Sequence, residues 1–331
     1  MRRILTRIIY AIPLLIGVLV ITFVVTRSLG DPVAQIAGPL ASLEEVAALR
    51  ERLGLNDPIL TQFWNYLGEL AHGSLDTSLV SQRPVLTEMG ERIGGTAELI
   101  VLGTALAFVW GIVLGALSVY TKRLGRIADA LALTGMALPD FVLGLLLALI
   151  FAFQLRWAPS PVGQIDLVAI PPPNRTGGAA LDALLAGQWS SLWPSLGFLV
   201  LPVITLGLIY GAPIARLAQG AFLETRRKAF IEYAELSGLS SVRVFRYTLR
   251  NALPSVMTLS GIVAGYLIGG IVLVEIVFSW GGLGQWAALS ILAIDMPAIQ
   301  AFVLLAGVLT LFIYLFLDIA YGLIDPRVRT S

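Results

Sequence analysis

Residues 232–254 read Glu232-Tyr-Ala-Glu-Leu-Ser-Gly238-Leu-Ser-Ser-Val-Arg-Val-Phe-Arg-Tyr-Thr-Leu-Arg-Asn-Ala-Leu-Pro254, a polar and basic stretch between two long apolar segments. A helical run ends near Ser237 and is followed by Gly238, the residue type that most readily adopts a positive φ after a helix end. A basic amphipathic run then leads to Pro254, where a new apolar segment begins. The stretch therefore predicts two short helices, bent at Gly238 and held at one face of a membrane.

The composition of the whole chain is that of a membrane protein. Of its 331 residues, 57% are hydrophobic and only 13% are charged, whereas a soluble domain carries about 25% charged residues. The sequence has no cysteine, which excludes disulfides, thiol catalysis and thiolate metal sites. It has a single histidine, His72. No Gly-x-x-x-x-Gly-Lys-Ser/Thr phosphate loop occurs either, so the chain cannot hydrolyse ATP by that route.

Six apolar runs are each long enough to cross a bilayer, which takes about 20 helical residues. They cover residues 8–29, 96–120, 128–155, 192–215, 255–280 and 299–323. A signal peptide is the alternative interpretation of the first run, but the run is longer than an h-region of about 7–15 residues and lacks a small-x-small cleavage site. We therefore expect an all-α, polytopic membrane protein with six transmembrane helices, the first of them retained.

Two longer segments connect these runs. In residues 30–92, Ser42 followed by two glutamates is typical of a capped helix start, which predicts a short surface helix that ends at Gly54. Aromatic residues from Phe63 to Tyr66 suit a segment at the membrane interface, where such side chains gather. Residues 157–191 are rich in proline and glycine and are expected to form a loop.

The distribution of basic residues predicts the orientation, because loops on the cytoplasmic side carry an excess of Lys and Arg. Residues 30–92 carry 9 acidic and 4 basic residues. In contrast, 15 of the 22 Lys and Arg residues lie in the two termini and in the second and fourth connections: Arg2, Arg3, Arg7, Lys122, Arg123, Arg126, Arg216, Arg226, Arg227, Lys228, Arg243, Arg246, Arg250, Arg327 and Arg329. Both termini and the 232–254 stretch are therefore expected in the cytoplasm.

Several motifs along the chain resemble one protein family. Glu232, Ala234 and Gly238 resemble the Glu-Ala-Ala-x-x-x-Gly loop of the permease subunits of binding-protein-dependent ABC importers. Motifs of the oligopeptide, dipeptide and nickel subfamily also occur: Gly30-Asp31-Pro32, Leu53-Gly54-Leu55-Asn56-Asp57-Pro58, Arg83-Pro84-Val85, Arg250-Asn251-Ala252-Leu253, Phe278-Ser279-Trp280, Gly282-Leu283-Gly284 and Asp325-Pro326-Arg327. Glu235 and Ser237 stand where this subfamily often has basic residues.

The resemblance implies a type I ABC importer permease fold, with three parts. Residues 1–29 would hold the cytoplasmic N-terminus and first transmembrane helix, 30–95 an extracytoplasmic segment with short helices, and 96–331 a five-helix core with a cytoplasmic coupling loop at 216–254. In that loop, six residues are expected to meet an ATPase: Glu232, Ala234, Glu235, Leu236, Gly238 and Leu239.

The resemblance also implies the function of a non-catalytic membrane subunit in a prokaryotic plasma (inner) membrane. It would form half of the path for short peptides, beside a second permease, two ATPase subunits and an extracytoplasmic substrate-binding protein. No cofactor is expected in this chain, since ATP and Mg would bind to the ATPases. Nickel chelates, glutathione and oligosaccharides are alternative substrates. A secondary transporter, which would need paired intramembrane charges in inverted halves, and a membrane enzyme or assembly factor are more remote alternatives.

Two acidic residues fall inside predicted spans, where a carboxylate costs about 2.5–3.5 kcal/mol on insertion scales. Asp140 lies near the middle of the third span and is a candidate for the translocation path; a paired structural aspartate, or one displaced toward water by a kink at Pro139, is the alternative. Glu275 lies near the outer end of the fifth span and is a candidate for an outer gate, with structural pairing inside the subunit as the alternative. The small residues Gly261, Gly265, Gly269 and Gly270 resemble a pattern that permits close helix packing.

The predicted orientation is testable because the chain contains no cysteine. We expect an impermeant thiol reagent, added to intact cells, to label a Ser74→Cys variant and to leave a Ser240→Cys variant unlabelled. After permeabilisation both variants should be labelled, which controls for a buried thiol. Labelling of Ser240→Cys in intact cells would overturn the predicted topology.

Overall fold

The computed structural model describes residues 13, 16–25, 33, 37, 41–52, 54–73, 75–166 and 168–324. Within these ranges the chain is helical, and its β-structure is the isolated bridge between Thr77 and Pro84. The helices are α3 (Leu43–Arg52), α4 (Ile59–Ala71), α5 (Val85–Gly90), α6 (Ile93–Tyr120), α7 (Lys122–Ala137), α8 (Asp140–Leu147), the π-helix η1 (Ala148–Gln154), α9 (Ala179–Ala186), α10 (Trp189–Arg226), α11 (Ala229–Leu236), α12 (Ser241–Val277), α13 (Leu283–Leu292) and α14 (Met296–Ile324).

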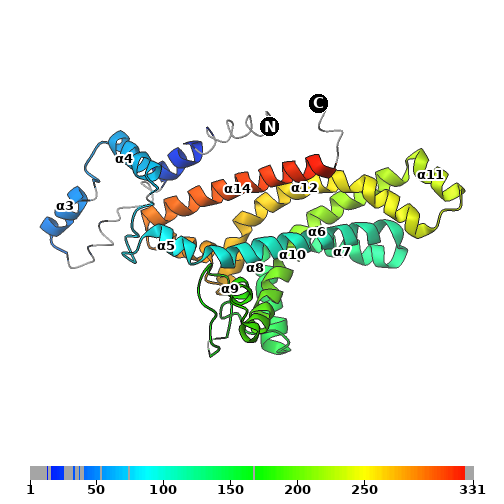
Figure 1. The fold of residues 1–331 in the computed structure, drawn as a ribbon, viewed down its shortest axis with the longest axis horizontal. Helices are drawn as coiled ribbons and strands as arrows, with labels where there is room; N and C mark the ends of the chain where they lie inside the picture. The colour runs from blue at the N-terminus through cyan, green and yellow to red at the C-terminus, as the bar shows by residue number, and fades with distance from the viewer. Residues whose placement is uncertain are drawn as a thin grey trace.

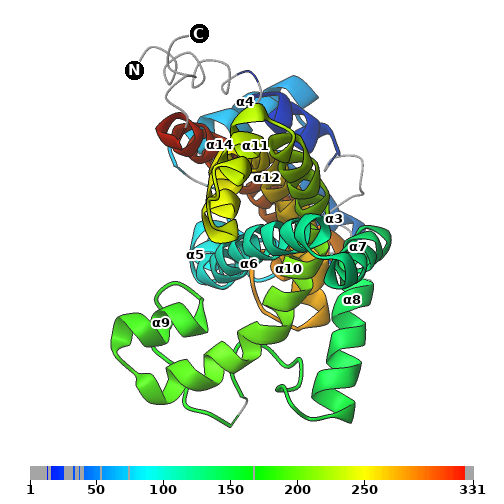
Figure 2. The ribbon, with the colours of Figure 1, turned by 90° about the vertical axis from the view of Figure 1, so that its right-hand side faces the viewer.

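Helices α6, α10, α12 and α14 run along the length of the molecule (Figure 1). α11 lies at one end, which we call the α11 end, and α13 follows the far end of α12, which we call the α13 end. Helices α8 and α9 lie on one side of this bundle, below α6 in the view along its length (Figure 2).

Two helical segments of the described chain are long and apolar enough to cross a membrane, Val85–Tyr120 and Trp189–Arg226. A third candidate is the pair formed by Lys122–Ala137 and Asp140–Gln154, whose two halves meet at 114°. Shorter apolar helices cover Ile16–Val25, Gly265–Val277, Leu283–Leu292 and Met296–Phe312. These segments agree with a polytopic membrane protein, and the count of six crossings stays a prediction.

Three sequence-based boundaries were wrong. The third apolar run is broken at Leu138–Pro139, because the residue before a proline is held in an extended conformation. The predicted second short helix is the beginning of α12, which continues through Pro254; prolines are tolerated inside transmembrane helices because neighbouring groups satisfy the freed carbonyl. Part of the predicted loop is helical, since α9 and the start of α10 lie within residues 157–191.

The short surface helix after Ser42 is present as α3. The Ser42 hydroxyl accepts a hydrogen bond from the Glu45 N–H at 3.2 Å, and the Glu45 carboxylate accepts one from the Ser42 N–H at 2.8 Å. This reciprocal pair satisfies two N–H groups that a helix start leaves free. The helix stops before Gly54, which has φ +62°. Beyond it, the α4 side chains Phe63 and Tyr66 pack on Phe23 of the segment Ile16–Val25.

The tightest helix contact joins α6 and α10. A Cβ atom added at Gly111 would lie 2.6 Å from Ile214 Cγ2, and one added at Gly115 would lie 2.6 Å from Ala218 Cβ and 2.9 Å from the Ala215 carbonyl oxygen. Small residues at such positions let two helix backbones approach in a membrane. In the stripe of α12 glycines that the sequence suggested, Gly269 has nothing within 4 Å, so its packing role finds no support within the described chain.

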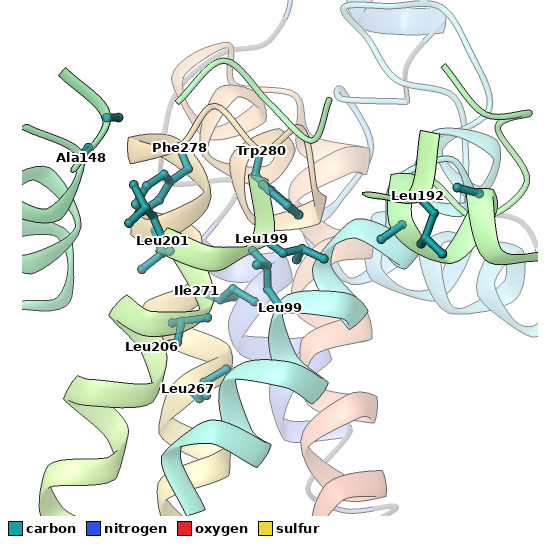
Figure 3. Packing of buried hydrophobic residues seen from close by; sticks show 14 residues of the cluster. Leu99, Ala148, Leu192, Leu199, Leu201, Leu206, Leu267, Ile271, Phe278 and Trp280 are labelled. Carbon is teal, nitrogen blue, oxygen red and sulfur yellow. The ribbon is translucent and has the colours of Figure 1, made fainter. Parts of the chain in front are cut away.

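One buried hydrophobic cluster ties α10 to the neighbouring elements (Figure 3). The cluster takes residues from α6, η1, α9, α10, α12 and the segment after α12, namely Leu99, Ala148, Ala152, Ala180, Ala183, Leu192, Leu199, Leu201, Leu206, Leu267, Ile271, Val274, Phe278 and Trp280. Because it lies toward the α13 end, that end of the bundle is held by packing across elements far apart in sequence.

We expect Gly115→Ala to destabilise the subunit by about 1–3 kcal/mol, the usual cost of adding an atom to a well-packed contact. The atoms that a new Cβ would meet include the backbone of α10, which cannot rotate away. The matched control is Gly220→Ala on the partner helix α10, where nothing lies within 4 Å and no loss is expected. Thermal unfolding of the detergent-solubilised variants measures the difference; equal melting temperatures would show that this helix contact is looser than described.

Candidate functional site

The 232–254 stretch begins with a short helix that is closed by a Schellman motif. At the end of α11, the Gly238 N–H donates to the Glu235 carbonyl at 3.0 Å and the Leu239 N–H donates to the Ala234 carbonyl at 3.1 Å. This pattern requires a left-handed residue after the helix, and Gly238 has φ +76°. The predicted glycine bend is therefore present, and it directs the chain from α11 into α12.

One face of α11 packs against the start of α12. Ile231 and Ala234 are buried with Val244, and Leu239 packs on the same group. Leu239 and Ala234 thus make the apolar contact that accompanies a Schellman motif. This contact orients α11 with respect to α12, so the two helices form one unit.

The opposite face of α11 is open. Leu236 is 82% exposed and Tyr233 is 74% exposed, and Glu232 and Glu235 are exposed beside them. Large apolar side chains at such exposure are typical of a surface that another protein covers. A hollow of about 430 Å³ adjoins this face and is lined by Phe230, Tyr233, Ala234, Leu239, Tyr247 and Asn251.

Charged and aromatic contacts connect α11 to the bundle. Arg226 at the end of α10 lies 3.7 Å from the Glu235 carboxylate, and its guanidinium lies 5.0 Å from the centre of the Tyr120 ring. Tyr120 in turn packs edge-on against Phe222 and Phe245. Exposed ion pairs contribute little stability, so the aromatic group is the firmer connection among α6, α10 and α12 at the α11 end.

Asp140 begins α8 and reaches toward two other helices. Its Oδ1 accepts the Phe141 N–H at 2.8 Å, and its Oδ2 lies 3.3 Å from the Tyr210 hydroxyl of α10. Gly270 of α12 lies beside both groups. The side chain is half-buried, and its position in the translocation path stays a prediction. Tyr210 was missing from the sequence-based set, and Gly270 was named there only as part of a packing pattern. A hydroxyl in the middle of an apolar run was the available signal for Tyr210.

Glu275 is fully buried and has hydrogen-bond partners inside the chain. Its Oε1 accepts the Thr96 hydroxyl at 2.6 Å, and its Oε2 accepts the Gln285 N–H at 2.8 Å in the first turn of α13. The same Thr96 oxygen accepts the Leu283 N–H at 2.8 Å. A carboxylate at a helix N-terminus satisfies free N–H groups and is favoured by the helix dipole. Glu275 therefore fixes α13 to α6 and α12; its role in a gate stays a prediction.

Among the residues that the structure describes, no group of three or more His, Asp or Glu side chains is placed to hold a metal ion. The predicted site residues lie in three separate places. The coupling set Glu232, Ala234, Glu235, Leu236, Gly238 and Leu239 lies together at the α11 end. Asp140 and Glu275 lie on other helices and share no hydrogen bond in the described chain.

Comparisons with known proteins cover nearly the whole chain. The family described as "Binding-protein-dependent transport system inner membrane component" matches residues 107–330, and its N-terminal counterpart, "Binding-prot-dependent transport system membrane comp, N-term", matches residues 1–89. The probable D,D-dipeptide transport system permease protein DdpB of Escherichia coli (strain K12) is 38% identical over 316 residues, 94% of this chain and 93% of the relative.

Two further relatives are similar over 98% of both chains. The dipeptide transport system permease protein DppB of Alkalihalophilus pseudofirmus is 35% identical over 327 residues, and the glutathione transport system permease protein GsiC of Salmonella typhimurium is 34% identical over 330 residues.

Among solved structures, the inward-facing MetNI methionine ABC transporter contains a similar chain, with a TM-score of 0.51 and 18% sequence identity. The match covers 70% of this chain and 94% of that one, and it confirms the expected all-α fold of a type I ABC importer permease. From these family matches and full-length relatives, the chain belongs to the inner membrane components of binding-protein-dependent transport systems.

Proposed function

We propose that this chain is one of two permease subunits in an ATP-driven importer of short peptides. The observation that carries the proposal is the exposed face of α11, fixed by the Gly238 bend and bearing Tyr233, Glu235 and Leu236. An amphipathic helix of this kind docks in a groove of a partner. The proposed partners are two ATPase subunits that bind ATP and Mg, a second related permease and an extracytoplasmic substrate-binding protein.

The proposed orientation places both termini and α11 in the cytoplasm, in agreement with the distribution of Lys and Arg. Residues 1–29 would then hold the first crossing, 30–95 an extracytoplasmic segment, and 96–331 the five-helix core with the coupling loop 216–254. In this arrangement the α11 end meets the ATPases and the α13 end meets the binding protein. Asp140 is proposed to line the path and Glu275 to hold the outer end closed.

The mechanical part of the proposal follows from the contacts of α11. Because α11 is packed on the first turns of α12 and Arg226 joins it to α10, a displacement of α11 by an ATPase is transmitted to both helices. Closure of the ATPases on ATP would move the two coupling helices together and turn the path from inward- to outward-facing. Two sites linked in this way bias each other with the same free energy. The subunit itself performs no covalent step.

Short peptides are the proposed substrates because the relatives named above include permeases of dipeptide transport systems. Glutathione is the second candidate, favoured by the similarity to GsiC over 98% of both chains. We expect the complex, reconstituted in liposomes with its binding protein and ATP, to accumulate alanyl-alanine. Excess unlabelled dipeptide should compete more strongly than glutathione. Uptake that only glutathione inhibits would replace the peptide assignment with the second candidate.

We expect Gly238→Val to uncouple the complex without preventing its assembly. A β-branched residue at φ +76° carries backbone strain of about 1–3 kcal/mol, while a Cβ there would meet nothing within 4 Å. The substitution is therefore expected to change the direction in which the chain leaves α11, without a side-chain clash. Binding-protein-stimulated ATP hydrolysis should fall about five- to thirtyfold, the factor that corresponds to 1–2 kcal/mol.

The matched control for this experiment is Gly238→Asn, because asparagine tolerates the left-handed conformation far better than a β-branched residue. The asparagine variant should keep most of the stimulation. Full stimulation and full uptake by an assembled Gly238→Val complex would show that this loop does not transmit the movement.

A further inference from the structure

Three polar groups from three helices meet where α8, α10 and α12 adjoin. The Tyr210 hydroxyl of α10 lies 3.3 Å from Asp140 Oδ2 of α8 and 3.5 Å from the Tyr266 carbonyl oxygen of α12. We call Asp140, Tyr210 and the Tyr266 carbonyl the α8–α10–α12 cluster. α8 packs against both α10 and α12, so the cluster lies where the three helices adjoin.

Gly270 provides the room that the cluster needs. A Cβ atom added there would overlap the Tyr210 hydroxyl and the Asp140 Oδ2. The tyrosine and the carboxylate therefore occupy space that any other residue type on α12 would fill. The two side chains are half-buried, and the neighbouring Tyr266 is 72% exposed, so the cluster borders an open surface of this subunit.

The cluster holds more acceptors than donors. The one Tyr210 proton is offered to two oxygens at 3.3 and 3.5 Å, both long for an O–H···O hydrogen bond. Asp140 Oδ1 has the Phe141 N–H as its partner, which leaves the lone pairs of Oδ2 poorly satisfied. The Tyr266 carbonyl lies inside α12, where it also accepts a helical N–H. An additional group with several donors fits this arrangement.

A cation is the donor that fits this carboxylate best. Asp140 lies within an apolar part of the chain, where an uncompensated carboxylate is unfavourable. Within the described ranges its carboxylate forms no ion pair with a Lys, Arg or His side chain. A bound metal ion fits poorly, because Ca²⁺ takes six to eight oxygen ligands and the described chain holds no group of three or more Asp, Glu or His side chains that could bind a metal.

We propose that the α8–α10–α12 cluster receives the α-ammonium group of the transported peptide. An ammonium group is a compact cation with three donors. The geometry gives it the Asp140 carboxylate, the Tyr266 carbonyl and the Tyr210 oxygen as acceptors. This inference rests on the proposed peptide function and adds to it a recognition element inside the membrane subunit, separate from the binding protein.

The test compares alanyl-alanine with N-acetyl-alanyl-alanine, which lacks the charge. The reporter is a single cysteine in this chain, Tyr266→Cys, because only the backbone carbonyl of Tyr266 belongs to the cluster. In the purified complex, alanyl-alanine should slow thiol labelling of this cysteine, and the acetylated peptide should not. Adding Asp140→Asn should reduce the protection about tenfold or more, since the amide cannot form the stronger hydrogen bond that a charged carboxylate makes, whereas Asp140→Glu should retain part of it.

A second measurement separates recognition from assembly and from the proposed function. Co-purification with the partner subunits reports assembly, and alanyl-alanine uptake by the wild-type complex reports the function. Gly270→Ala, which pushes the two side chains apart while keeping both, should weaken protection as Asp140→Asn does.

Three results would overturn the inference. The first is that both peptides protect the cysteine equally. The second is that Asp140→Asn leaves the protection unchanged. The third is that the reagent cannot reach the Tyr266→Cys thiol because another subunit covers it. Wild-type uptake of alanyl-alanine together with any of these would reject the ammonium site and keep the peptide importer. Absence of wild-type peptide uptake would reject both.

Discussion

Helices α6 and α10 approach each other to backbone distance, and the other elements of the bundle are placed around this contact. The approach depends on positions such as Gly111 and Gly115, where even a methyl group would overlap the partner helix. α10 also packs against α7, α8, α9 and α12. Since lipid provides little hydrophobic driving force between helices, close packing of small residues is a main source of their association. A change in the spacing of α6 and α10 would therefore displace both the coupling helix and the α8–α10–α12 cluster.

The α13 end is organised by a different interaction, the acceptance of backbone N–H groups by buried and half-buried carboxylates. Glu275 takes an N–H of α13, and Glu98 takes the Leu181 N–H of α9 at 2.6 Å. Asp182 takes the N–H groups of Arg175 and Thr176 at 3.1 and 3.0 Å. Buried polar groups must find such partners. The Glu275 and Glu98 contacts join α13 and α9 to the bundle, and the Asp182 contacts join the preceding loop to α9. This end is accordingly held by specific directional contacts.

Features that depend on local chemistry could be predicted from the sequence. The helix cap at Ser42 and the bend at Gly238 are properties of a few adjacent residues, and both are present in the structure. The extent of α12 through Pro254 was missed, and a kink at Pro139 was foreseen only as an alternative, without the 114° angle, because the effect of a proline on a helix depends on the neighbours that satisfy the freed carbonyl. The partners of Asp140 come from α10 and α12, and no spacing along one chain reveals such a meeting.

The continuity of α12 has a consequence for the amplitude of movement. Its 37 residues form one helix that follows the Gly238 bend and contains Glu275 near its far end, a rod about 55 Å long at 1.5 Å per residue. If the rod pivots at its α11 end without bending, a tilt of about 5° shifts the other end by about 5 Å. That distance is comparable to one helical turn, and it exceeds the length of every hydrogen bond that fixes Glu275. A small rotation at the coupling helix is thus geometrically large enough to separate α13 from its anchor.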